Sequence, residues 1–263
     1  MPDLLEALSS ARVFDLEQLR YAGAPSHPAH QPGFNYFLHR HHAPGAGEAR
    51  TGASGIVVMP EHSGTHIDAL AHQAENLTLY GGVHVDSGVQ TSVGFRVLGI
   101  ETMAPLVSRG VLLDVAGPKR LAPEHSITVE ELERAAKAAH IDIRQGDVVL
   151  VRTGYGALWS EHPDEYLRGA GVSSAGSSWL IDKKVSAVGA DNMAWDVIGP
   201  TDPELGVTLP GHVLLLVRAG IPIIENLNLE ELAAAGVHEF GFVCLPLKMR
   251  GATGSPVRPI ALA

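Results

Sequence analysis

Three histidines and an aspartate within eleven positions form the part of this sequence best suited to chemistry: His62, His66, Asp68 and His72. Imidazole and carboxylate groups are the side chains through which proteins bind Zn²⁺, Mn²⁺ and Fe²⁺. The chain has 14 histidines, so the alternative is a loop in which unrelated histidines fall close together. A single His-x-x-x-His pair would be weak evidence. The spacing of four candidate groups after an apolar run favours a metal site.

The local sequence indicates how three of these side chains converge. The apolar run 56–60 reads as a buried strand that ends at a proline. Gly64 then permits a turn that brings the rings of His62 and His66 together. His66 and Asp68 are two positions apart, so they point to the same side of an extended backbone. Three protein ligands leave coordination positions open, which is typical of a catalytic metal site.

The same segment resembles the signature of the metal-dependent cyclase family, and it reads His62-Ser-Gly-Thr-His66-Ile-Asp68-Ala-Leu70-Ala-His72. That family includes bacterial kynurenine formamidase, isatin hydrolase and a zinc-dependent dienelactone hydrolase. Many members carry proline where this chain has Leu70. The resemblance implies a cyclase-family (swivelling β/β/α-like) fold, a divalent metal cofactor (Zn²⁺ or Mn²⁺, one or two per chain) and a homo-oligomer, either a dimer or a tetramer.

His212 and Glu225 form a second candidate pair further along the chain. Pro210 opens a predicted helix that ends at Gly220, and a strand over 222–224 follows. A helix followed by a returning strand places Glu225 at the sheet edge from which His212 departs. Taken alone, these two residues are a histidine near a helix start and a capping glutamate. The resemblance implies that they bind a second metal ion, or serve as proton partners or substrate contacts where one ion is bound.

The remaining pattern predicts one α/β domain over 1–263, with a mixed sheet and flanking helices. Apolar runs predict strands at 12–16, 110–115, 147–152 and 185–190, and helical signals fall at 128–140, 173–182, 210–218 and 228–235. Thr128 and Glu131 form a capping box, which makes 128–140 the clearest helix. Asp191 ends a predicted strand and is either the partner of a metal-bound histidine or a capping residue.

Aromatic residues gather at 34–37 after a loop rich in Gly, Pro and His. Phe34 and Tyr36 are predicted to bind substrate as part of a pocket wall, and the alternative is a satellite core cluster. The histidines of 39–42 follow directly, and strand alternation is expected to scatter them over both faces. A second His-x-Asp pair, His84 and Asp86, has no third ligand close by and is read as a turn with a short strand.

Composition excludes several classes of protein. The formal net charge of −10 and the lack of a long basic cluster argue against binding to nucleic acid or to an anionic membrane. The single cysteine, Cys244, excludes an internal disulfide and is expected to pack in a buried strand. Neither a signal peptide nor an apolar run of about 20 residues is found, so a cytoplasmic protein is expected.

These residues together predict a metal-dependent hydrolase that cleaves an amide, formamide, cyclic amide or lactone bond of a small molecule. The metal would be held by His62, His66 and Asp68, with His212 and Glu225, and would activate a water molecule. His72 is the predicted catalytic group that moves a proton to the leaving atom. One alternative is a cyclase or lyase that acts on a polyketide-like substrate. The other is a metal-binding protein without catalysis.

Overall fold

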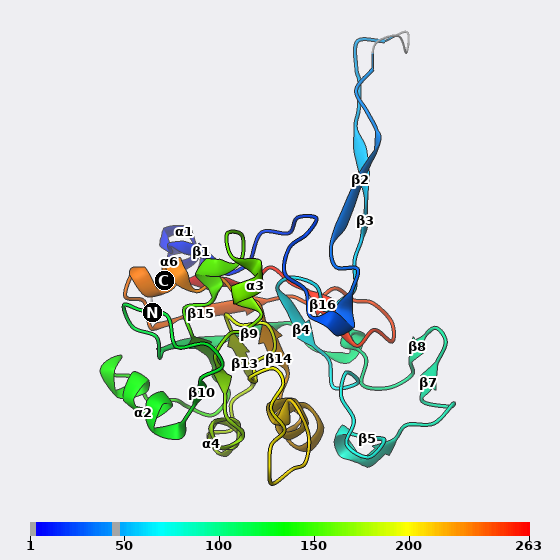
Figure 1. The fold of residues 1–263 in the computed structure, drawn as a ribbon. Coiled ribbons are helices and arrows are strands. Elements are labelled where there is room, and N and C mark those ends of the chain that lie inside the picture. Colours follow the sequence, from blue (N-terminus) through cyan, green and yellow to red (C-terminus); the bar gives the residue numbers. More distant parts are fainter. Residues whose placement is uncertain (1–3, 44–47) are drawn as a thin grey trace.

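A nine-stranded mixed β-sheet organises the protein in the computed structural model, which describes residues 4–43 and 48–263 (Figure 1). Its four middle strands run parallel to one another, and every other pairing in the sheet is antiparallel. In spatial order the strands are β1 (Val13–Asp15), β17 (Ile260–Leu262), β15 (Glu239–Cys244), β9 (Leu106–Asp114), β11 (Val148–Arg152), β13 (Ala187–Ala190), β14 (Ile223–Glu225), β4 (His66–Asp68) and β16 (Gly254–Pro256).

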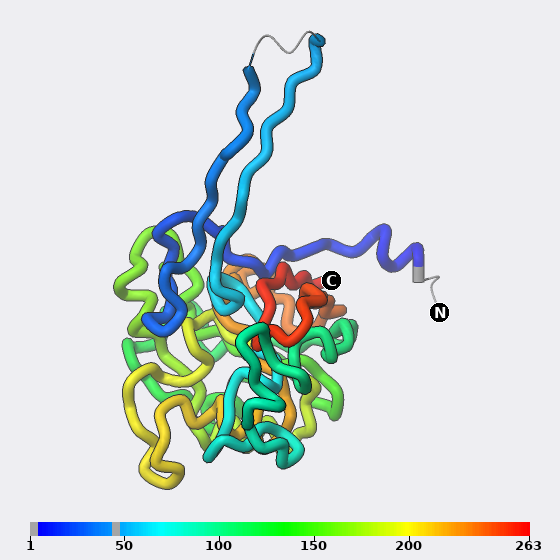
Figure 2. The backbone as a smooth tube through the Cα atoms, turned by 90° about the vertical axis from the view of Figure 1, so that its right-hand side faces the viewer, coloured from blue at the N-terminus to red at the C-terminus, as the bar shows by residue number. Residues whose placement is uncertain are grey.

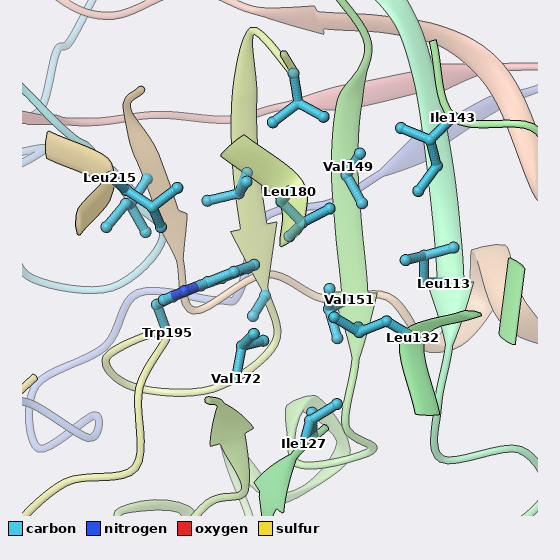
Figure 3. Packing of buried hydrophobic residues seen from close by; sticks show 14 of the residues in the cluster. Leu113, Ile127, Leu132, Ile143, Val149, Val151, Val172, Leu180, Trp195 and Leu215 are labelled. Carbon is cyan, nitrogen blue, oxygen red and sulfur yellow. The ribbon is translucent and has the colours of Figure 1, made fainter. Parts of the chain in front are cut away.

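Both faces of this sheet are buried because its central strands carry apolar side chains toward both faces. On one face, Val149 and Val151 share a cluster with residues of α2 (Val129–Ala138), α4 (Ser174–Asp182) and the π-helical turn η5 (Val213–Ala219), which continues α5 (Pro210–His212). Figure 3 shows this cluster from close by. On the other face, Val148 and Leu150 pack with β15, β17 and α6 (Glu230–Ala234). The central strands are therefore held by packed side chains on both faces of the sheet.

Shorter elements surround the sheet. The remaining helical segments are α1 (Leu4–Ser10), η1 (Pro28–His30), η2 (Tyr80–Gly82), η3 (Ile100–Thr102), η4 (Gly156–Leu158) and α3 (Pro163–Tyr166). The two-stranded sheets pair β2 (Asn35–Arg40) with β3 (Ser54–Val58), β5 (Thr78–Leu79) with β6 (Val83–His84), β7 (Gln90–Thr91) with β8 (Gly94–Phe95), and β10 (Ser126–Ile127) with β12 (Gly171–Val172). None of the helices in the described part of the chain has the length and apolar character needed to cross a membrane.

The predicted α/β class with a mixed sheet is confirmed. The helix predicted over 128–140 is α2, and its capping box is present: Thr128 N donates to Glu131 Oε2 at 2.9 Å, and Glu131 N to Thr128 Oγ1 at 3.4 Å. The helix predicted over 210–218 begins at Pro210 but changes to π-helical geometry at Val213. Cys244 is buried in β15, as expected.

One strand prediction was wrong in its burial. The apolar run 56–60 was expected to form a buried strand, but Ile56, Val57 and Val58 lie in β3 and are each about half exposed (49–51%). This strand pairs only with β2, in a hairpin that projects far from the body of the protein in both views (Figures 1 and 2). A short apolar run predicts a strand, but it does not distinguish a strand in the core from one in a projecting hairpin.

Asp191 follows β13 and holds the loop after β11, which settles the two roles that the sequence left open. Its carboxylate accepts hydrogen bonds from Thr153 N and Oγ1, both at 2.7 Å, from Gly154 N at 2.9 Å and from Gly156 N at 3.3 Å. The side chain is fully buried, and burial raises the pKa of Asp191 to about 6. Asp191 is therefore a loop-capping residue and no partner of the histidines.

Replacement of Asp191 tests this assignment. Asp191→Ala leaves several buried donors without an acceptor, so it should lower the free energy of unfolding by about 3 kcal/mol. Urea unfolding followed by circular dichroism measures the change. Asp164→Ala, at an exposed acid in the first turn of α3, serves as the control. A loss in Asp191→Ala no larger than in the control would contradict the capping role.

Candidate metal centre

The candidate ligands meet because β4 lies between β14 and β16. The antiparallel register sets Glu225 on β14 opposite His66, and Gly254 on β16 opposite Asp68. Gly64, with φ of +66°, forms the predicted turn that returns His62 to the end of β4. A Cβ atom on Gly254 would lie 2.6 Å from His62 Cε1, so glycine is needed for the ring to enter. The sheet edge is thus shaped around the histidines.

All five residues predicted to bind metal are brought together, each no more than 4% exposed. Around Asp68 Oδ1, His62 Nδ1 lies at 2.8 Å and His66 Nε2 at 3.4 Å. His66 Nε2 is also 3.4 Å from Glu225 Oε2. His212 Nε2 lies 3.2 Å from Glu225 Oε1 and 3.7 Å from Asp68 Oδ2. Three imidazole rings therefore surround two neighbouring carboxylates.

The outward nitrogen of each ring has a fixed partner. Carbonyl and carboxylate oxygens only accept, so His66 Nδ1 donates to Gly64 O at 2.8 Å and His212 Nδ1 donates to Asp196 Oδ2 at 2.9 Å. His62 Nε2 lies 2.9 Å from Thr253 Oγ1, which itself donates to the Glu61 carboxylate. Such outer partners set the tautomer and orientation of metal-binding histidines.

The charges of the cluster call for a cation at its centre. Asp68 Oδ2 and Glu225 Oε1 are buried and have no hydrogen-bond partner among the described residues. Burial disfavours the charged form of each group, yet the two carboxylates outweigh it and raise the pKa of His66 to about 10. The pKa of Glu225 is held below its usual value by His212 and His66 against the same burial. A divalent cation in place of the imidazolium protons would satisfy both carboxylates.

Three overlapping ligand sets can be identified: two contain Asp68, and the third is formed by His30, His62 and His72. The donor atoms of His62, His66 and Asp68 lie within 4.8 Å of one another, and so do those of Asp68, His72 and His212. The first set is the one predicted from the sequence. In the second, His72 takes the place expected for Glu225. The residues present therefore fit one or two divalent ions.

His72 stands beside the cluster and faces the pocket. Its ring stacks on that of His62, with ring centres 3.9 Å apart. Burial and the neighbouring imidazoles lower the pKa of His72 to about 3, although Asp68 acts in the opposite direction. His72 is thus held neutral next to the ligands, and its ring borders the pocket.

A pocket of about 250 Å³ opens onto the cluster, and sequence reasoning missed part of its wall. Besides the cluster residues, the lining includes His27, His30, Gln73, Met193, Ala194 and Leu209. His27 and His30 lie in the segment 21–34, which was predicted only to be a loop. Its richness in histidine was the one signal that it could reach the site. Asp196, the partner of His212, was not predicted, because the sequence does not distinguish it from the nearby Asp191.

The two aromatic residues predicted to bind substrate lie elsewhere. Phe34 is half-buried and Tyr36 is 52% exposed on β2, and neither lines this pocket. The ring of Tyr36 covers Gly55 on the neighbouring strand, where a Cβ atom would lie 2.3 Å from it. A contact of either residue with substrate stays a prediction.

The other histidine clusters also lie away from the centre. His39, His41 and His42 are exposed on the hairpin arm and just beyond it. His84 is exposed on β6, and Asp86 accepts hydrogen bonds from Gly88 N at 2.7 Å and Val89 N at 2.9 Å. The second His-x-Asp pair is therefore a turn, as read from the sequence.

Comparison with known proteins points to one family. The sequence model of the family described as "Putative cyclase" matches residues 14–197, which include His62, His66, Asp68 and His72. The chain is 28% identical over 207 residues to Cyclase-like protein 3 of Oryza sativa subsp. japonica, covering 78% of this chain and 63% of that protein. It thus spans less than two thirds of that relative's length.

Two bacterial relatives carry the names of hydrolases. Isatin hydrolase of Roseibium aggregatum is 26% identical, covering 78% of this chain and 73% of that protein. Kynurenine formamidase of Polaromonas naphthalenivorans is 27% identical, covering 70% and 71%. Among solved structures, one of a novel cyclase superposes with a TM-score of 0.86 at 27% identity, covering 98% of this chain and 89% of the other.

The partner of His212 provides a test of the centre. Asp196→Asn removes the carboxylate that accepts from His212 Nδ1 and should weaken metal binding by about 10- to 100-fold. Competition with a chromophoric chelator measures the affinity of the folded variant, and circular dichroism verifies its folding. Asp164→Asn is the matched surface control. Unchanged affinity in Asp196→Asn would show that His212 takes no part in metal binding.

Proposed function

Because this chain belongs to the cyclase family, we propose that it is a metal-dependent hydrolase that cleaves an amide, formamide, cyclic amide or lactone bond of a small molecule. The observation that carries the proposal is the pocket that opens onto a buried ring of imidazoles and carboxylates. The names of the isatin hydrolase and kynurenine formamidase relatives support hydrolysis as the reaction class. We further propose that residues 1–263 act as one such domain, with a cytoplasmic location as a prediction.

In the proposed mechanism, His62, His66 and Asp68 would hold a divalent ion, Zn²⁺ or Mn²⁺. His212 and Glu225 would hold a second ion or, with one ion bound, would serve as proton partners or substrate contacts. A bound divalent ion supplies an activated water molecule and polarises a carbonyl group. Asp196, Gly64 O and Thr253 keep the outward ring nitrogens engaged, so the inward nitrogens stay directed at the centre.

His72 supplies the proton transfer. Its ring stacks on His62 and lines the pocket, so it lies between the ligands and the space that a substrate fills. Its imidazole takes a proton from the water that attacks the carbonyl carbon and gives it to the leaving nitrogen or oxygen. The cyclase or lyase alternative uses the same residues, and analysis of ¹⁸O incorporation from labelled water into product separates the two.

The non-catalytic alternative is less well supported. It requires a metal ion whose coordination positions are all filled by protein, and it gives no role to His72. The pocket of about 250 Å³ beside the cluster leaves room for a small molecule, although it is smaller than the roughly 300–1,000 Å³ of sites for drug-sized ligands.

Two histidine variants test the proposed division of roles. His72→Ala should keep its metal and lose about 10²- to 10⁴-fold in turnover, because general acid–base groups contribute on that order. His66→Ala should lose both metal and activity. Elemental analysis and hydrolysis of N-formylkynurenine and isatin give the two measurements. Activity that survives in metal-free His66→Ala would contradict the proposal, and loss of metal from His72→Ala would make His72 a ligand.

We also propose that the protein is a homo-oligomer in which the β2–β3 hairpin, the arm, packs against a second copy. Tyr36, Phe37, Leu38, Ile56, Val57 and Val58 are each 44–58% exposed on it. A two-stranded hairpin has little stability alone, and a contiguous apolar surface of this kind marks an interface. A substrate contact by Tyr36 would then be made in the pocket of the partner copy.

Charge on the arm tests this proposal. The wild-type protein should elute as a dimer or tetramer at micromolar concentration, and Ile56→Lys with Val58→Lys should shift it to monomer because each lysine must be desolvated at the interface. Size-exclusion chromatography with light scattering gives the mass. Val93→Lys, at a valine that is already 89% exposed, is the control. A monomeric wild type, or an oligomeric double variant, would refute the role of the arm.

A further inference from the structure

The turn formed by residues 63–65 joins two of the proposed ligands, His62 and His66, and so sets the distance between their rings. All three residues of the turn are buried. Gly64, in its middle, has a φ of +66°. Glycine adopts positive and negative φ about equally well, so the turn has little conformational preference of its own. Contacts from other parts of the chain must therefore select its shape.

Arg20, which follows β1 in the sequence, binds the two outer carbonyl groups of this turn. Its Nη1 donates to Ser63 O and its Nη2 donates to Thr65 O. Its Nε donates to Glu17 Oε1 at 2.8 Å. The guanidinium lies so close to the turn that a Cβ atom on Gly64 would be 2.5 Å from Nη1. A guanidinium presents several N–H donors in one rigid plane, so a single side chain can bind both carbonyl groups.

Asn226 binds the carbonyl group between them. Its Nδ2 donates to Gly64 O at 3.0 Å, and the same oxygen accepts from the His66 ring at 2.8 Å. The hydroxyl of Tyr166 donates to Asn226 Oδ1 at 2.9 Å, which directs the amide nitrogen toward the turn. Thr65 Oγ1 in turn donates to Asn226 O at 2.6 Å. The side chain of Asn226 is therefore fixed at both ends, and the residue is only 1% exposed.

We propose that Arg20 and Asn226 are positioning residues of the metal centre, which hold all three carbonyl groups of the 63–65 turn and fix the separation of His62 and His66 before an ion binds. Neither residue is among the proposed ligands, and neither lines the pocket. Ligands that are held in place beforehand lose little conformational freedom on binding, so the affinity for the ion is higher. This inference rests on the proposed metal centre.

Two substitutions remove the contacts with little other change. Arg20→Lys keeps the positive charge, but its single nitrogen cannot reproduce the planar fork. Asn226→Gly removes the amide and keeps a residue that adopts the φ of +57° found at this position without strain. Arg258→Lys is the matched control, because Arg258 lines the same surface groove as Arg20 and pairs with Asp15 instead of the turn.

The measurements use Co²⁺ as the probe ion. Its visible absorption spectrum reports the coordination geometry, and competition with a chelator gives the affinity of the folded protein. Arg20→Lys and Asn226→Gly should each weaken Co²⁺ binding by about 10- to 100-fold, the range found when outer partners of metal ligands are removed, and should alter the spectrum. Arg258→Lys should change neither quantity.

A second comparison separates positioning from a general loss of stability. Asp191→Ala is expected to destabilise the protein, but Asp191 does not contact the 63–65 turn, so the folded variant should keep the wild-type spectrum and affinity. Urea unfolding of the metal-free proteins gives the stability of each variant. If Arg20→Lys does not fold, Asn226→Gly decides the question by itself.

The outcomes distinguish this inference from the proposals on which it builds. Wild-type affinity and spectrum in the two positioning variants would overturn the inference, even if both variants were less stable. Absence of Co²⁺ binding to the wild-type protein would contradict the metal centre itself, and the inference with it. Since no readout depends on turnover, the expected losses of affinity in a protein without hydrolase activity would support the positioning role and contradict only the proposed reaction.

Discussion

Two buried carboxylates, Asp68 and Glu225, lie side by side at the edge of the sheet, and the rest of the site is arranged around them. Neighbouring negative charges away from water are strongly unfavourable unless positive charge lies between or beside them. The register of β4 against β14 enforces their proximity, since Glu225 pairs with His66, and Asp68 lies two residues further along the same strand. The pKa values of His66 and His212 are raised, against the effect of burial, by neighbouring carboxylates, and a divalent ion would supply the positive charge in their place.

The precision of the site comes from the elements behind it. The parallel strands β9, β11, β13 and β14 are covered on both faces, so the ends of β14 and β4 cannot shift independently of the core. Asp196 accepts from Gly211 N at 2.7 Å and from His212 N at 3.2 Å, in addition to the His212 ring. The same carboxylate thus fixes both the start of α5 and the orientation of its histidine. Fold and ligand geometry are coupled through one side chain.

The convergence of His62, His66 and Asp68 could be predicted from the sequence, because the residues that cause it are local. Gly64 and the two-residue spacing of His66 and Asp68 contain the turn and the shared strand face in themselves. The meeting of His212 and Glu225 followed from the rule that a helix and a returning strand come back to one edge, supported by the family resemblance. Asp191 and Asp196 were not distinguishable in the same way, because only the fold decides which of two nearby carboxylates reaches a ring.

The parts that escaped prediction depend on contacts distant in sequence or outside the chain. Thr253 reaches His62 across 191 positions, and nothing near either residue announces the contact. The burial of β3 was misjudged since an apolar strand reads alike in a core and in a projecting arm. His27 and His30 were hidden within a loop, whose shape comes from side-chain to backbone hydrogen bonds rather than from a periodic pattern.

The central claim is that this cluster binds a catalytic metal, and the most direct test is elemental analysis of purified, tag-free protein after dialysis. The account predicts one or two equivalents of a divalent transition metal per chain. Two equivalents would place His212 and Glu225 among the ligands. One equivalent would make them proton partners or substrate contacts. A protein that holds no metal under metal-replete conditions would contradict the account.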